Sequence, residues 1–129
     1  MYDLYHLFKK EKLFIFPRCT LTNLHSQTTI PIAAGQNEGH RFRHRELLVH
    51  EAVDIFQPNV GHVGGYTEAM KAAAMAQAFN KPIANGGAWP LHNMHLQAGM
   101  SNGWRVEFHY VFWMMYKSVY NQVPEPING

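Results

Sequence analysis

The chain has 129 residues, of which 47% are hydrophobic and 16% charged, with a formal net charge of +2 at pH 7. This composition is typical of one globular domain and excludes a disordered or low-complexity segment. The charge is too small to favour nucleic acid or an anionic membrane as a partner. One cysteine excludes a disulfide framework, and no apolar run approaches the roughly 20 residues of a membrane span. The N-terminus lacks a secretory signal pattern, so we expect a cytoplasmic protein.

The first half of the chain alternates between helical and strand patterns. Residues 4–11 are typical of the last turns of an amphipathic helix, because basic side chains gather near their end. Residues 41–50 predict a second helix, with Leu47 and Leu48 facing inward. Short β-prone runs, each stopped by a proline or a glycine, predict strands at 12–16, 29–34 and 53–57.

The second half continues the alternation. Residues 67–79 predict the clearest helix, because one apolar stripe recurs at helical spacing: Ala69, Ala72, Ala73, Ala76 and Phe79. Strands are predicted at 82–85 and 105–108, on either side of a helix at 91–100. Residues 111–120 predict a final apolar helix, whose segment 112–116 we expect to face the core.

The strand starts recur every 23 to 29 residues, with a helix between each pair. This pattern predicts βαβ units and a parallel sheet. A closed (β/α)8 barrel uses about 31 residues per unit, so about four units fit in this chain. We therefore expect an α/β fold that forms about half of a TIM-type (β/α) barrel, with parallel strands and outer helices. A small doubly wound sheet is the alternative, and the start of the chain within a helical pattern favours the half barrel.

Polar residues follow nearly every predicted strand. In barrels and in open α/β sheets, ligands bind at the carboxyl ends of the strands, where these residues are expected to gather. Taken singly, amides and glycines in such loops are ordinary turn residues, so the group is better evidence for a site than any member. The candidates are Gln36, Asn37, Glu38, Asn59, His62, Asn85, Trp89, Glu107 and His109.

Several segments have the order and spacing of a known family. They read IPIAAGQNE at 30–38, AVDIFQPN at 52–59, GGYTEA at 64–69, AAAMA and KPIA within 72–84, and RVE at 105–107. Over residues 12–110 the chain thus resembles the C-terminal barrel of the mandelate racemase/muconate lactonizing group of the enolase superfamily. The resemblance implies that residues 1–129 are the C-terminal part of such a barrel. It also implies that the N-terminal capping domain and the first barrel strands lie outside this chain.

The resemblance implies a chemistry as well. In that group Mg²⁺, held by three carboxylates on successive strand ends, stabilises the anion formed when the proton α to a carboxylate is removed. Gln36 stands where the third metal carboxylate is expected, and Glu38 lies two residues further on, so both are candidate metal ligands. Glu107 stands where the acid that hydrogen-bonds the intermediate is expected, which makes it a candidate catalytic residue.

The chain also departs from the family pattern. The first metal carboxylate would lie before residue 1, and Phe16 stands near the position of the second. Asn59 stands at the Asp position of the His–Asp dyad that serves some members as base, and is the second candidate catalytic residue. Gly86 stands near the His position of the same dyad. The alternative function is therefore a non-catalytic truncated chain or a pseudoenzyme without a working metal site.

Strand ends lined with amides suit a polyhydroxy acid better than an aromatic one. The resemblance therefore implies a sugar-acid dehydratase rather than a racemase of apolar acids, with Asn85, Trp89 and His62 as candidate substrate-binding residues. Half a barrel leaves strand edges unpaired, so we also expect the chain to self-associate. The basic run at 40–45 is interpreted as a solvated helix face, and the nine histidines as structural or surface residues.

Overall fold

The computed structural model describes residues 18–87 and 90–127. The predicted helix end at 4–11, the predicted strand at 12–16, Phe16 and Trp89 lie outside the described residues. The strands are β1 (Ala33–Ala34), β2 (Ile55–Phe56), β3 (Ile83–Asn85) and β4 (Gly103–Val106). The helices are α2 (Arg18–Ser26), α3 (His40–Val49), α4 (Val60–Val63), α5 (Gly65–Ala78), α6 (Pro90–Ala98) and α7 (Tyr110–Lys117).

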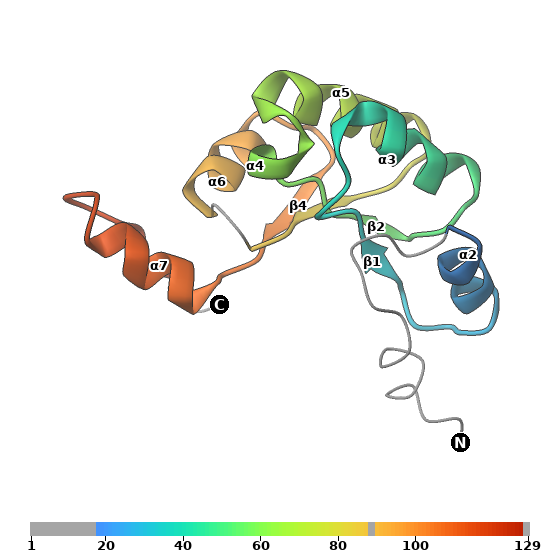
Figure 1. Cartoon of the computed structure of the whole chain (residues 1–129), viewed down its shortest axis with the longest axis horizontal. Helices are drawn as coiled ribbons and strands as arrows, with labels where there is room; N and C mark the ends of the chain where they lie inside the picture. Colours follow the sequence, from blue (N-terminus) through green and yellow to red (C-terminus); the bar gives the residue numbers. More distant parts are fainter. Residues whose placement is uncertain (1–17, 88–89, 128–129) are drawn as a thin grey trace.

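The four strands form one parallel sheet in the order β1-β2-β3-β4. Each strand thus pairs with the next along the chain, as in a barrel and unlike the shuffled order of a doubly wound sheet. Helices α3 to α6 lie together on one side of the sheet (Figure 1). The expected α/β fold, a partial barrel with parallel strands and outer helices, is confirmed.

The main core lies between the sheet and helices α3 and α5. Leu47, Leu48, Phe56 and Ile83 are among its fully or almost fully buried side chains, as the inward position of both leucines predicted. The alanine stripe of α5 is also confirmed, since Ala69, Ala72, Ala73 and Ala76 are all buried. The prediction that Phe79 belongs to this buried stripe was wrong. Phe79 is the C-cap residue that follows α5, and its side chain is exposed.

Two helices were not predicted from the sequence. Helix α2 packs near the end of α3, where Thr22 Oγ1 donates a hydrogen bond to the carbonyl of His50 at 3.3 Å. Helix α4 has four residues, too few for a periodic pattern. Its boundaries come from single residues: Asn59 caps its N-terminus, and Gly64 ends it in the left-handed conformation with φ of 105°.

The last strand and helix differ from their predictions. Strand β4 begins two residues before the predicted start, at Gly103. The expectation that 112–116 faces the core was wrong in part: Tyr116 is buried, but Met114 and Met115 are exposed. Figure 1 shows α7 extending beyond the sheet, away from α3 and α5. Of the residues in α7, Tyr116 alone is buried. No helix among residues 18–87 and 90–127 is long and apolar enough to cross a membrane.

Candidate functional site

The carboxyl ends of β1, β3 and β4 bring together two candidate residues and a glycine pair. A Cβ atom on Gly86 would lie 2.4 Å from Gln36 Oε1, so the Gln36 side chain occupies the space beside this glycine. The amide of Gly87 donates a hydrogen bond of 2.5 Å to Glu107 Oε2. Gln36 and Glu107, which follow β1 and β4, therefore contact the consecutive glycines Gly86 and Gly87.

The other residues near β1 are engaged in contacts of their own. Glu38 Oε2 accepts a hydrogen bond from Arg43 Nε at 3.1 Å, so its charge is paired. A ring nitrogen of His62 lies 3.3 Å from the carbonyl oxygen of Gln36, which places the exposed His62 at the edge of the same site. Asn37 is exposed in the turn after β1.

The carboxylates of the described residues do not form a site that fits Mg²⁺. This cation is bound through oxygen ligands, with carboxylates supplying the compensating charge. Nowhere in 18–87 and 90–127 do three His, Cys, Asp or Glu side chains gather as a metal would require. Gln36 is neutral, Glu38 is paired with Arg43, and Glu107 is held by the Gly87 amide. The two candidate metal ligands thus lack the partners that the resemblance implies.

Asn59 and Asn85 are both completely buried at the strand ends. Asn59 Oδ1 accepts a hydrogen bond from the amide of Gly61 at 2.9 Å and so caps α4. Asn85 Nδ2 donates to the carbonyl of Pro58, and its Oδ1 accepts from Gln97 Nε2 at 2.7 Å. These bonds fix the loops after β2 and β3. Both side chains thus hold loops together.

Two residues of α6 that the sequence did not single out belong to the same region. Asn93 is completely buried, and its side chain contacts the backbone of Val60 and of Gly86. Gln97 contacts both β3 and the end of β4. In the sequence, the feature that could have identified Asn93 and Gln97 is a pair of amide side chains four positions apart in a helix that follows a strand.

His44 of α3 is completely buried beside Gly35, the residue that follows β1. Its Nδ1 pairs with the carbonyl of His40 at 3.1 Å, and its ring packs near Phe56 with centroids 5.7 Å apart. Burial lowers the pKa of His44 below its ordinary value of 6.5, although hydrogen bonding to the backbone of His40 and the charge of Glu38 act in the opposite direction. We infer that His44 is neutral at pH 7.

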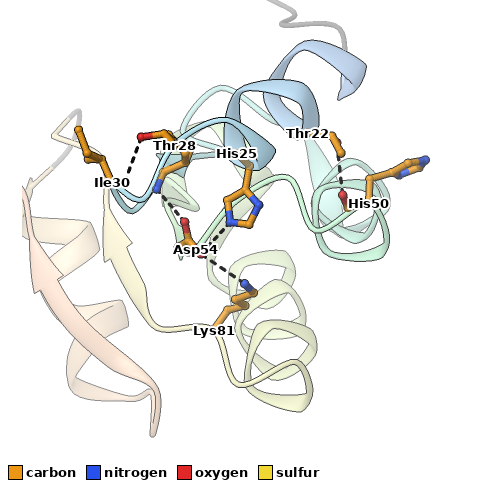
Figure 2. Close-up of polar contacts among 8 residues, drawn as sticks. Thr22, His25, Thr28, Ile30, His50, Asp54 and Lys81 are labelled. Atoms are coloured by element: carbon orange, nitrogen blue, oxygen red, sulfur yellow. Dashed lines mark hydrogen bonds and ion pairs between the residues drawn. The ribbon is translucent and has the colours of Figure 1, made fainter.

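A second polar cluster occupies the opposite, amino end of the sheet. Figure 2 shows Asp54 between His25 of α2 and Lys81, which precedes β3. Asp54 Oδ1 lies 2.9 Å from His25 Nε2 and 3.8 Å from Lys81 Nζ, while Oδ2 accepts a hydrogen bond of 2.9 Å from the amide of Ile32. Partial burial acts to raise the pKa of Asp54, but the hydrogen bond from Ile32 and the neighbouring His25 and Lys81 outweigh it and lower the pKa.

Comparison with known proteins places this geometry in a family. Residues 18–129 match the enolase C-terminal domain-like family. A D-galactonate dehydratase from Ralstonia pickettii (strain 12J) is 38% identical over 78 residues, which are 60% of this chain and 20% of that protein. The chain therefore spans about a fifth of the length of this curated relative.

Two solved structures share the fold and part of the sequence. A mandelate racemase/muconate lactonizing enzyme-like protein from Rubrobacter xylanophilus has a TM-score of 0.69 and 32% identity, over 73% of this chain and 25% of that one. L-talarate dehydratase from Polaromonas sp. JS666, solved with Mg and L-glucarate, has a TM-score of 0.65 and 28% identity, over 78% of this chain and 27% of that one. With parallel strands in barrel order and a family match that spans most of its length, this chain belongs to the enolase C-terminal domain-like family.

Proposed function

We propose that this chain supplies part of the substrate-facing surface of an acid-sugar dehydratase barrel, and that its substrate is a small polyhydroxy carboxylate. The observation that carries the proposal is the placement of Gln36 and Glu107 on the glycine pair Gly86–Gly87, at the carboxyl edge of a parallel sheet. The similarity to a D-galactonate dehydratase and to an L-talarate dehydratase bound to L-glucarate supports a sugar acid.

In this proposal Glu107 is the residue that contacts the substrate most directly. The Gly87 amide fixes one of its oxygens, and a carboxylate offers several lone pairs with which to accept hydrogen bonds from sugar hydroxyls. The Gln36 amide both donates and accepts, which suits a hydroxyl or a carboxylate. We expect His62 and Trp89 to border the same substrate, and the buried Asn85 to hold the loops beside it.

The superfamily's Mg²⁺-assisted removal of an α-proton needs a metal site that the described residues do not form. We therefore assign no proton-transfer step to Glu107 or Asn59. The second candidate function is a non-catalytic chain that keeps the barrel packing without a working metal site. The neutral amide at Gln36 and the pairing of Glu38 with Arg43 favour it.

Isothermal titration calorimetry of the chain with D-galactonate and with Mg²⁺ tests both functions. We expect weak galactonate binding that Glu107→Gln weakens about tenfold, because hydrogen bonds to a charged group are stronger than those to a neutral one. Glu125→Gln is the matched control, since Glu125 pairs with Lys117 outside the site. No galactonate binding at millimolar concentration would contradict the substrate-facing role. A stoichiometric Mg²⁺ isotherm that Glu38→Gln abolishes would establish Glu38 as a metal ligand.

Self-association is a further prediction, as are a cytoplasmic location and the lack of nucleic-acid or membrane partners. Helix α7 exposes the apolar side chains of Val111, Met114 and Met115, which lie three and four positions apart, and Val119 is exposed in the turn that follows. An exposed apolar surface of this kind favours association in water. Sedimentation velocity at several concentrations should show oligomers, and Met114→Glu together with Met115→Glu should shift them toward monomer. A monomer at every concentration would contradict this prediction.

A further inference from the structure

Helix α6 places two amide side chains, Asn93 and Gln97, one turn apart on the face that meets the sheet. Residues at i and i+4 of a helix lie above one another, so both amides can reach the ends of neighbouring strands. Asn93 is completely buried and Gln97 half-buried. Amides inside a protein are costly unless they are hydrogen-bonded, so their partners show what they hold.

Asn93 joins the loop after β2 to the loop after β3. Its Oδ1 accepts a hydrogen bond from the amide of Val60 at 3.0 Å. Its Nδ2 donates to the carbonyl of Gly86 at 2.9 Å. One buried side chain therefore links the first residue of α4 with the first residue of the glycine pair.

Gln97 joins β3 to the end of β4. Its Nε2 lies 3.0 Å from the carbonyl oxygen of Ile83 and 2.8 Å from that of Arg105. The same nitrogen lies 2.7 Å from Asn85 Oδ1. An amide NH₂ group has two protons, so the three acceptors share them. Because Asn85 in turn donates to the carbonyl of Pro58, the contacts of Gln97 extend to the loop after β2.

We propose that Asn93 and Gln97, here called the amide clamp, are positioning residues that set the spacing between Gln36 and Glu107. The clamp bonds the carbonyl of Gly86, the residue on which Gln36 packs. The next residue, Gly87, donates to Glu107, and Gln97 holds the carbonyl of Arg105 two residues before that carboxylate. The clamp is thus connected to Gln36 through Gly86, and to Glu107 through Gly87 and Arg105. The inference rests on the proposed function only in assigning Gln36 and Glu107 to the substrate.

A neutral clamp suits this place for a physical reason. Charged side chains at the same positions would be costly to bury, and they would alter the potential at an edge that receives an anionic substrate. Amides supply donors and acceptors in fixed directions without adding net charge.

Residue-resolved hydrogen exchange of the whole chain tests the clamp without using activity. In Asn93→Asp the acceptor for Val60 remains while the donor to Gly86 is lost, so we expect the Gly87 amide to exchange about tenfold faster with Val60 little changed. In Gln97→Met we expect faster exchange at the Glu107 amide, which pairs with Asn85 across β3 and β4. If Asn93→Asp does not fold, the exchange of the Glu107 amide in Gln97→Met tests the proposal.

The matched control is Asn102→Asp, at the amino end of the sheet. Asn102 Nδ2 donates to the carbonyls of Ala73 and Lys81, both at 3.1 Å, so the substitution removes a similar pair of bonds far from the candidate site. We expect the control to leave Gly87 and Glu107 unchanged. Unchanged exchange at Gly87 and Glu107 in the clamp variants would overturn the proposal, and so would an equal change at every amide of the chain, α3 included. Because galactonate binding is measured separately, failure of the proposed function would not affect this result.

Discussion

The two ends of the sheet are held together by different chemistry. At the amino end, the carboxylate of Asp54 contacts His25 and Lys81 and accepts a hydrogen bond from the amide of Ile32. The side chains of Asp54, His25 and Lys81 are all partly exposed to water. At the carboxyl end, neutral and completely buried amides such as Asn85 and Asn93 bond the backbone of neighbouring loops.

This difference separates the part of the fold that provides stability from the part that can bind a ligand. In parallel barrels the carboxyl end carries the ligand and the amino end does not. Charged pairs at the amino end can therefore fasten α2 to the sheet without affecting a ligand. Neutral amides at the carboxyl end fix the loops and leave Glu107 as the carboxylate facing the glycine pair.

The largest effect is expected from Gly86→Ala, which tests how closely the carboxyl end is packed. The added Cβ would lie 2.4 to 2.6 Å from three atoms of Gln36, so this side chain must move. Overpacking of this kind costs about 1–3 kcal/mol in the free energy of unfolding, measured by urea denaturation. Gln36→Ala should relieve the cost, giving a coupling of about 1 kcal/mol or more in the double-mutant cycle.

Gly39→Ala is the control for this cycle, because nothing lies within 4 Å of a Cβ on Gly39 and its φ of −81° is open to alanine. It should change stability by less than about 0.5 kcal/mol. If Gly86→Ala costs the same whether residue 36 is Gln or Ala, then Gln36 does not occupy the space beside Gly86. The packing of the candidate site would then be wrong.

The sequence predicted those features that depend on local periodicity. The strand and helix alternation gave a parallel sheet, and the spacing of the alanines gave the buried face of α5. The strand ends predicted that Gln36 and Glu107 lie at one edge, because parallel strands end on the same side. The contact of each with an adjacent glycine was not predicted.

The features that were missed depend on residues far apart in the sequence. Asn93 bonds Val60 across 33 positions, and no periodicity marks such a pair. The four-residue α4 depends on single capping residues rather than on a repeated pattern. The exposure of Met114 and Met115 depends on where α7 lies, whereas the sequence shows only that the helix is apolar.

A smaller effect, on the carboxyl side, is expected from His44. Its pKa is lowered in the folded chain, so between that pKa and 6.5 the unfolded chain binds more protons. The contribution of neutral His44 is therefore fully present above pH 6.5 and is lost as the pH falls toward the folded pKa. Urea denaturation from pH 7.5 to 5 should show this loss, and His44→Phe should reduce it. His95→Gln, at an exposed histidine of α6, should not; an equal change in both variants would contradict the role of burial.

The smallest effect is expected at the amino end, from Asp54→Asn. The pKa of Asp54 is lowered in the folded chain, so its contribution is present above the ordinary value near 3.8 and is lost as the pH falls through the folded pKa. Water screens the pairs with His25 and Lys81, which keeps this contribution modest. Urea denaturation between pH 5 and 2.5 should be less steeply pH-dependent in Asp54→Asn than in the unchanged chain.

Adding 1 M salt should weaken the ion pairs of Asp54 while the Ile32 hydrogen bond remains, so part of the pH dependence should persist. If salt removes all of it, the ion pairs alone lower the pKa; if Asp54→Asn leaves the pH dependence unchanged, the two ends of the sheet do not differ in the way their chemistry indicates.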